Sequence, residues 1–245
     1  MSRLLRSLLA LACGVTALAA GPATGAASAT GPASTAARVD CAVVKCVALT
    51  FDDGPGKYAG ELLDTLKKHK AKATFFLQGQ YVKSRPAFAR RMAKEGHELG
   101  NHSYRHSNFT GISIEDIRTE VVSTQEIVHE VTGEWPVLLR PPYGLSTPSV
   151  EQVAAEVNLP IVLWNAGSRD WALRDTKEIT KQVLKVAERN SVVLMHDWVQ
   201  ESVKAMPAIL TELSKRGYHM VTVSDVLGDA MPAAGGTFPA DKVVG

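Results

Sequence analysis

VALTFDDGP, residues 47–55, joins a mostly apolar run directly to two adjacent aspartates and a Gly-Pro pair. A short apolar segment that is bounded by turn residues is typical of a strand buried on both faces, as in a parallel sheet. Carboxylates that follow such a strand would lie at the edge of the sheet and not in its core. The stretch therefore predicts a parallel α/β fold with a candidate functional position at Asp52 and Asp53.

Segments of the same kind recur along the chain and alternate with amphipathic helical patterns. The predicted strands are Val47–Phe51, Ala73–Leu77, Glu98–Asn101, Val137–Arg140, Ile161–Trp164, Val192–Met195 and Met220–Val223. The predicted helices are Tyr58–His69, Arg85–Lys94, Ile114–Val131, Pro148–Val157, Thr176–Glu188 and Val203–Lys215. About seven strand–helix repeats fit either a barrel or a doubly wound sheet.

Reactive side chains follow the predicted strands at their carboxyl ends, which form one face in a parallel β/α protein. Because active sites of such proteins lie on that face, we expect these side chains to converge into a single site. They are Asp52, Asp53, His102, His106, Arg140, Asp170, His196 and Asp197.

His102 and His106 are four residues apart, a spacing that on a helical turn places both imidazoles on one side. A carboxylate from Asp52 or Asp53 would complete a His₂Asp set with an open fourth position, which is typical of a catalytic zinc site. The second aspartate would then be free to take a proton, and His196 to donate one. The alternative is a surface histidine pair beside a solvated Asp-Gly-Pro turn.

Five segments in this order resemble the motifs of the polysaccharide deacetylase family, the NodB homology domain of carbohydrate esterase family 4. They are Thr50–Pro55, His102–His106, Arg140–Gly144, Asp170-Trp171 and Leu194–His196. The resemblance implies a distorted (β/α) barrel of about seven parallel strands. It also implies a metal-dependent hydrolase that removes N-acetyl groups from N-acetylglucosamine units of chitin-like or peptidoglycan polymers.

The resemblance further implies a role for each site residue. Asp53, His102 and His106 would hold the divalent metal, which is zinc in most relatives, with cobalt as another candidate. Asp52 would be the general base for the attacking water, and His196 would be the general acid for the leaving amine.

The remaining implied roles concern positioning and substrate. Arg140 would orient the aspartate base, and Asp170 would support the histidine acid. The backbone amide of Tyr143 would stabilise the oxyanion, and Trp171 and Leu194 would line the pocket for the acetyl methyl group. Two alternatives stay open, namely O-deacetylation of a polymer such as acetylxylan and a non-catalytic wall-binding protein.

The N-terminus has the layout of a secretory signal peptide. Arg3 and Arg6 precede an apolar run over residues 4–20, and small residues follow. An uncleaved anchor and a lipoprotein attached through Cys13 are the alternatives. The predicted organisation is a signal peptide at 1–29, a linker at 30–39, a deacetylase domain at 40–227 and an irregular tail at 228–245.

The charge balance limits the partners. Without Arg3 and Arg6, the 27 basic residues become 25, which equals the number of acidic residues. A neutral body argues against nucleic acid and favours an acetylated polysaccharide as the partner. We expect a monomer without stable membrane insertion once the signal peptide is cleaved.

Cys41 and Cys46 precede the first strand, and we expect them to form a disulfide in an oxidising compartment. So short a loop would add only about 2 kcal/mol to stability in the loop-entropy model. Two buried free thiols are the alternative.

Overall fold

The computed structural model describes residues 39–240, and its central element is the ten-residue strand β1 (Lys45–Gly54). Along one edge, β1 pairs with β6 (Ser191–His196). Along the other edge, it pairs first with β7 (Tyr218–Val221) and then with β2 (Thr74–Leu77). All of these pairings are parallel, as the apolar strands without alternation predicted.

The sheet curves back on itself through a segment that forms only isolated bridges. Beyond β2 lies β3 (Glu98–Asn101), and Leu139 bridges β3 to β4 (Ile161–Val162). The chain then continues into β5 (Ala166–Gly167), which pairs with β6. Parallel contacts thus run from β5 through β6, β1, β2 and β3 to Leu139 and β4, and the prediction of a distorted (β/α) barrel is confirmed.

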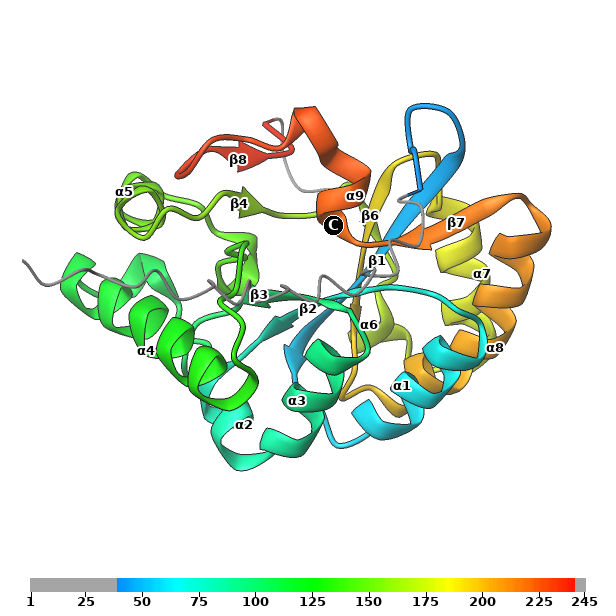
Figure 1. The fold of residues 1–245 in the computed structure, drawn as a ribbon, viewed down its shortest axis with the longest axis horizontal. Coiled ribbons are helices and arrows are strands. Elements are labelled where there is room, and N and C mark those ends of the chain that lie inside the picture. Colours follow the sequence, from blue (N-terminus) through cyan, green and yellow to red (C-terminus); the bar gives the residue numbers. More distant parts are fainter. Residues whose placement is uncertain (1–38, 241–245) are drawn as a thin grey trace, which may run out of the picture. The chain divides into compact units, whose positions relative to one another are not determined.

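Six longer helices surround this sheet (Figure 1) and pack in the order α7, α8, α1, α3, α4 and α5. Each buries an apolar stripe against the strands, as their amphipathic patterns predicted. Their bounds are α1 Ala59–Lys68, α3 Pro86–Lys94, α4 Ile114–Thr132, α5 Pro148–Glu156, α7 Thr176–Val186 and α8 Gln200–Lys215.

The predicted strand Val137–Arg140 is reduced to bridges at Leu139. Pro136 and Pro141 flank the segment and lack the amide hydrogens that a longer ladder would need. The predicted strand Met220–Val223 ends earlier, at Val221, because the next residue caps a short helix, α9 (Val223–Leu227).

Several short elements carry too few residues to show a hydrophobic period. They are the helices α2 (Gly79–Ser84) and α6 (Asp170–Leu173) and the 3₁₀ turns η1 (Phe109–Gly111), η2 (Pro142–Gly144) and η3 (Gly228–Ala230).

The segment after Leu227, which we expected to be irregular, contains a strand. β8 (Thr237–Phe238) pairs in parallel with β4. The amides of Ile161 and Leu163 donate to the carbonyls of Gly236 and Phe238 at 2.9 and 2.7 Å. The expectation was wrong for this part because the edge of β4 offers backbone donors that the tail satisfies.

The predicted signal peptide and most of the linker lie outside the described residues. Among the helices within 39–240, none is long and apolar enough to cross a membrane.

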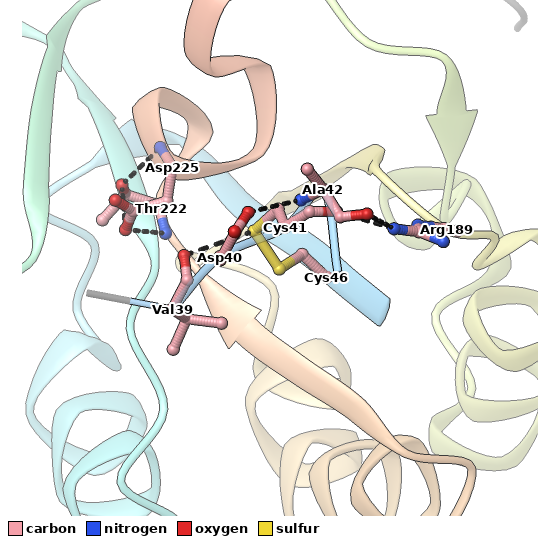
Figure 2. The surroundings of a disulfide bond; sticks show 8 residues. All are labelled: Val39, Asp40, Cys41, Ala42, Cys46, Arg189, Thr222 and Asp225. Carbon is pink, nitrogen blue, oxygen red and sulfur yellow. Dashed lines mark hydrogen bonds between the residues drawn. A yellow bond between two sulfur atoms is a disulfide. The ribbon is translucent and has the colours of Figure 1, made fainter. Parts of the chain in front are cut away.

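The predicted disulfide is present and joins Cys41 to Cys46, the second residue of β1 (Figure 2). The two Cα atoms are 5.4 Å apart. Arg189, which precedes β6, donates through Nη2 to the carbonyl oxygen of Cys41 at 3.0 Å. The disulfide loop is thereby fixed to a segment far along the chain.

Candidate active site

Asp52 and Arg140 form a buried ion pair at the carboxyl ends of the strands. Arg140 is fully buried, and its Nη1 donates to Asp52 Oδ1 at 2.7 Å and to Thr50 Oγ1 at 2.8 Å. Its remaining nitrogens donate to the carbonyls of Val162 and Leu163. Burial lowers the pKa of Arg140, although the charge of Asp52 opposes this. A guanidinium stays charged in proteins, so it holds one oxygen of Asp52 in a fixed direction.

Asp53, His102 and His106 direct their donor atoms at one another, all within 4.8 Å. The Nε2 atoms of His102 and His106 lie 3.4 and 3.3 Å from Asp53 Oδ1. His102 Nδ1 lies 2.6 Å from the carbonyl oxygen of Arg140. Because only an N–H at Nδ1 can bond to that carbonyl, the Nε2 lone pair is free for a metal. The residues fit a divalent cation.

The pKa shifts of Asp53 and His106 favour metal binding. Burial raises the pKa of Asp53, but the hydrogen bond and charge of His102 and the charges of His106 and His196 outweigh burial and hold it well below its usual value. Burial, followed by the charge of His102, lowers the pKa of His106. An ionised carboxylate and a neutral imidazole are the forms that a metal requires. His102 differs, because burial lowers its pKa but the charge of Asp52 and the hydrogen bond and charge of Asp53 outweigh burial and raise it, so a metal would displace its second proton.

The segment from His102 to His106 is a loop, so the helical turn predicted from the four-residue spacing was wrong. Ser103 and His106 have left-handed φ angles of 64° and 61°. The Ser103 hydroxyl accepts from the His106 amide, and the carboxylate of Glu120 accepts from the Tyr104 amide, both at 2.9 Å. These side-chain acceptors replace helical hydrogen bonds, and the two rings still meet with centroids 4.9 Å apart.

Two residues that the sequence did not assign to the metal site hold Asp53. Gln78 Nε2 donates to Asp53 Oδ1 at 2.7 Å, and Trp198 Nε1 donates to Asp53 Oδ2 at 3.1 Å. Gln78 directly follows β2, so its place at the same edge of the sheet could have identified it.

His196, at the end of β6, is bound to a buried carboxylate. Its Nδ1 lies 2.8 Å from Asp170 Oδ1, and its amide and the Ser202 hydroxyl donate to Asp170 Oδ2 at 2.8 and 2.6 Å. Its Nε2 lies 3.9 Å from Asp53 Oδ2. Burial lowers the pKa of His196, but the hydrogen bond and charge of Asp170 and the charges of Asp52 and Asp53 outweigh it and raise the pKa to about 9.

These groups open into a cavity of about 490 Å³. Tyr143, which is 60% exposed, has a left-handed φ of 61° and places its ring centroid 4.6 Å from that of His106. Trp171 is exposed and Leu194 is buried in the same wall. The residues that line the cavity are Asp52, Asp53, His102, His106, Tyr143, Gly144, Trp164, Trp171, Leu194, His196 and Trp198.

The structure therefore gathers the residues singled out in the sequence. Arg140 and Asp170 lie behind the cavity wall, each bonded to a residue that lines it.

Asp197 differs from the other side chains of this group because it supports the backbone. It is completely buried, and its Oδ2 accepts from the Gly56 amide at 2.8 Å. A methyl group added at Gly54 or Gly56 would lie within 2.7 or 2.5 Å of its carboxylate oxygens. Burial raises the pKa of Asp197 to about 7, although the Gly56 amide opposes this. It shapes the turn that follows Asp53.

A comparison with protein families matches residues 40–162 to the model described as polysaccharide deacetylase. The chain is similar to the peptidoglycan-N-acetylglucosamine deacetylase PgdA of Listeria monocytogenes, with 39% identity over 188 residues. It is also similar to the peptidoglycan-N-acetylmuramic acid deacetylase PdaC of Bacillus subtilis, with 37% identity over 183 residues. These matches cover 76% and 74% of this chain but only 40% and 38% of the relatives.

Among solved structures, the chain resembles one described as T48 deacetylase with substrate, with a TM-score of 0.77 and 38% identity. The match covers 82% of this chain and 99% of that one. The likeness therefore extends over nearly the whole of the solved chain.

Proposed function

Because the chain belongs to the polysaccharide deacetylase family, we propose that it is a secreted, metal-dependent enzyme that hydrolyses N-acetyl groups of N-acetylglucosamine units in peptidoglycan or a chitin-like polymer. The observation that carries the proposal is the juxtaposition of the Asp53, His102 and His106 donors with two groups suited to proton transfer. A binding protein would have no need for such a set.

The metal in this proposal is a divalent cation, most readily zinc, held by Asp53, His102 and His106. Two imidazoles and one carboxylate with an open position are the ligand set of hydrolytic zinc sites. When bound there, the ion supplies Lewis acidity for the amide carbonyl and for water.

Asp52 acts as the general base. Its Oδ1 is occupied by Arg140 Nη1, whereas Oδ2 lies 3.7 Å from His102 Nε2, on the side of the metal donors. A carboxylate oxygen that faces the site is suited to take a proton from the attacking water. Arg140 acts through Asp52 and is a positioning residue.

His196 acts as the general acid. Asp170 accepts at Nδ1, so the Nε2 proton of the imidazolium is directed toward the cavity. A pKa raised to about 9 keeps this proton in place at neutral pH for transfer to the leaving nitrogen. The Tyr143 amide would stabilise the oxyanion, and Trp171 and Leu194 would enclose the acetyl methyl group.

The proposal includes the compartment and the domain organisation. The signal-like N-terminus and the Cys41–Cys46 disulfide support secretion or cell-wall association. We propose a monomer with the deacetylase domain at about 40–227 and a linker before it.

The test is acetate release from peptidoglycan and chitooligosaccharides by the zinc-loaded protein. Asp52→Asn should reduce kcat by about 10²- to 10⁴-fold, because it removes a general base without changing the size of the side chain. Asp229→Asn is the matched control, since Asp229 is exposed and lies in η3. Equal rates for wild type and Asp52→Asn would contradict the mechanism.

O-deacetylation is the second candidate, because the same residues would promote the attack of water on an ester. Acetate release from acetylxylan, compared with that from chitin oligomers at equal acetyl concentration, separates the two. A higher kcat/KM on acetylxylan than on chitin oligomers would show that the enzyme is an O-deacetylase and not an N-deacetylase.

A further inference from the structure

A second cavity of about 420 Å³ adjoins the candidate active site. Asp53 and Trp198 line both cavities, so the two spaces meet at these residues. The remaining lining residues are Lys57, Tyr58, Gln78, Tyr81, Arg85, Arg174, Gln200 and Glu201. The site described above uses none of its three cations.

The cations of this cavity lie on aromatic faces. Lys57 Nζ lies 4.9 Å from the ring centroid of Tyr58. Arg85 lies 4.8 Å from that of Tyr81, and Arg174 lies 4.7 Å from that of Trp198. Such contacts hold a cation in place without neutralising it.

Within residues 39–240, none of the three cations forms an ion pair, so their charge is available to a ligand. Arg85 donates through Nη1 to the Pro55 carbonyl, and Arg174 donates through Nε to the Trp171 carbonyl, which leaves both terminal nitrogens of Arg174 without a described acceptor. Glu201 is the one carboxylate in the lining besides Asp53, and Asp53 is committed to the histidines. The cavity therefore has an excess of positive charge.

We propose that this second cavity binds a carboxylate on the sugar next to the one that is deacetylated. The proposal rests on the proposed function, because it assigns the neighbouring subsite of the same polymer. Muramic acid bears a carboxyl-ended ether substituent that N-acetylglucosamine lacks. Lys57 and Arg174 would donate charge-assisted hydrogen bonds to the carboxylate, while the aromatic rings would contact the sugar. The enzyme would thus prefer glycan strands with a free muramic acid carboxylate, that is, strands without the stem peptide at that position, to neutral chitin-type strands.

Binding provides a test that does not depend on turnover. The zinc-loaded protein is titrated with a peptide-free glycan tetrasaccharide that contains muramic acid and with the same tetrasaccharide after reduction of its carboxyls to alcohols. We expect the carboxylate form to bind about tenfold more tightly at low salt, as one or two partly exposed charged hydrogen bonds allow. The preference should shrink in 0.5 M NaCl because exposed charges are screened.

The double variant Lys57→Gln/Arg174→Gln should abolish the preference between the two tetrasaccharides. Its matched control is Lys70→Gln/Lys177→Gln, which removes the same charge from two exposed positions outside the cavity. Lys70 also matches Arg174 in backbone, with φ of 54° against 48°. A third variant, Glu201→Gln, should increase the preference.

The outcomes separate this inference from the proposed function. Equal affinity of wild type for the two tetrasaccharides, or a preference that the double variant retains, would overturn the carboxylate site. A carboxylate preference in binding without acetate release from any substrate would support the site and contradict the deacetylase. A greater preference for strands that keep their stem peptides would identify peptide carboxylates as the occupant instead of the sugar carboxylate.

Discussion

At the residue scale, each proton-transferring group in the cavity is paired with a buried partner that fixes its orientation. Arg140 occupies one oxygen of Asp52, and Asp170 occupies Nδ1 of His196. In both cases the partner leaves one atom facing the cavity. The chemistry therefore depends on residues that substrate does not touch.

Asp170→Asn should move the basic limb of the pH–rate profile to lower pH. Activity that needs protonated His196 is lost as pH rises through its pKa, which is raised to about 9 in the structure. Removing the Asp170 charge lowers that pKa, so the loss begins at lower pH, by about one unit or more. The measurement is kcat/KM from pH 6 to 10, and an unchanged basic limb would show that His196 is not the acid.

Trp198→Phe should weaken metal binding while leaving the cavity filled by an aromatic ring. It removes the Nε1 donor to Asp53 Oδ2, and loss of such a bond to a ligand typically costs about 10- to 100-fold in metal affinity. The readout is zinc affinity by competition with a chelator. Trp171→Phe, in the wall of the same cavity, is the control and should keep the wild-type affinity.

At the element scale, contacts between neighbouring strands position the site, and one contact between β2 and β3 also makes the stability of the fold depend on pH. His97 directly precedes β3 and has a structural role, because its Nδ1 accepts from the amide of Ala73, the residue before β2, at 3.2 Å. Burial, assisted by the charge of Lys72, lowers the pKa of His97 to about 4. The neutral imidazole therefore helps to hold β2 and β3 together.

This lowered pKa predicts a specific loss of stability in acid. The unfolded chain takes up a proton at His97 near pH 6.5, whereas the folded chain does so only near pH 4. The contribution of His97 to the unfolding free energy is therefore complete above pH 6.5. It falls by up to about 3 kcal/mol as the pH is lowered to 4. His97→Gln, which keeps an acceptor but cannot titrate, should show a shallower pH dependence of the unfolding free energy. Parallel curves for wild type and variant would contradict the assignment.

At the scale of the whole molecule, long-range contacts attach the first and last parts of residues 39–240 to the barrel. The tail strand β8 covers the edge of β4, and the Cys41–Cys46 loop lies against Arg189. Neither contact touches the cavity. They contribute to stability and not to chemistry.

Cys41→Ser/Cys46→Ser should lower the unfolding free energy by about 2 kcal/mol, because the short disulfide loop restricts the unfolded chain only modestly. Urea unfolding of the double variant against wild type measures the difference, and adding a reductant should have a comparable effect on wild type alone. A reductant that destabilised the double variant equally would show that the effect does not come from this disulfide.

The sequence alone determined the alternation of strands and helices and the edge at which the reactive groups lie. Local apolar patterns are sufficient for this, because β1 and the long helices each bury one face or both. The order of motifs was also enough to identify the metal ligands as candidates. Short elements such as α2 and α6 were missed, since four to six residues carry no measurable period.

Only the tertiary structure decided how the site is held together. The 102–106 loop, the donors of Gln78 and Trp198 to Asp53, and the pairing of β8 with β4 depend on groups that lie far apart in the chain. The second cavity, too, was found only in the tertiary structure. The neutral composition gave no sign of this cavity, because the net charge is summed over the whole chain. Folding places Lys57 and Arg174 beside the site, and neither forms an ion pair within residues 39–240.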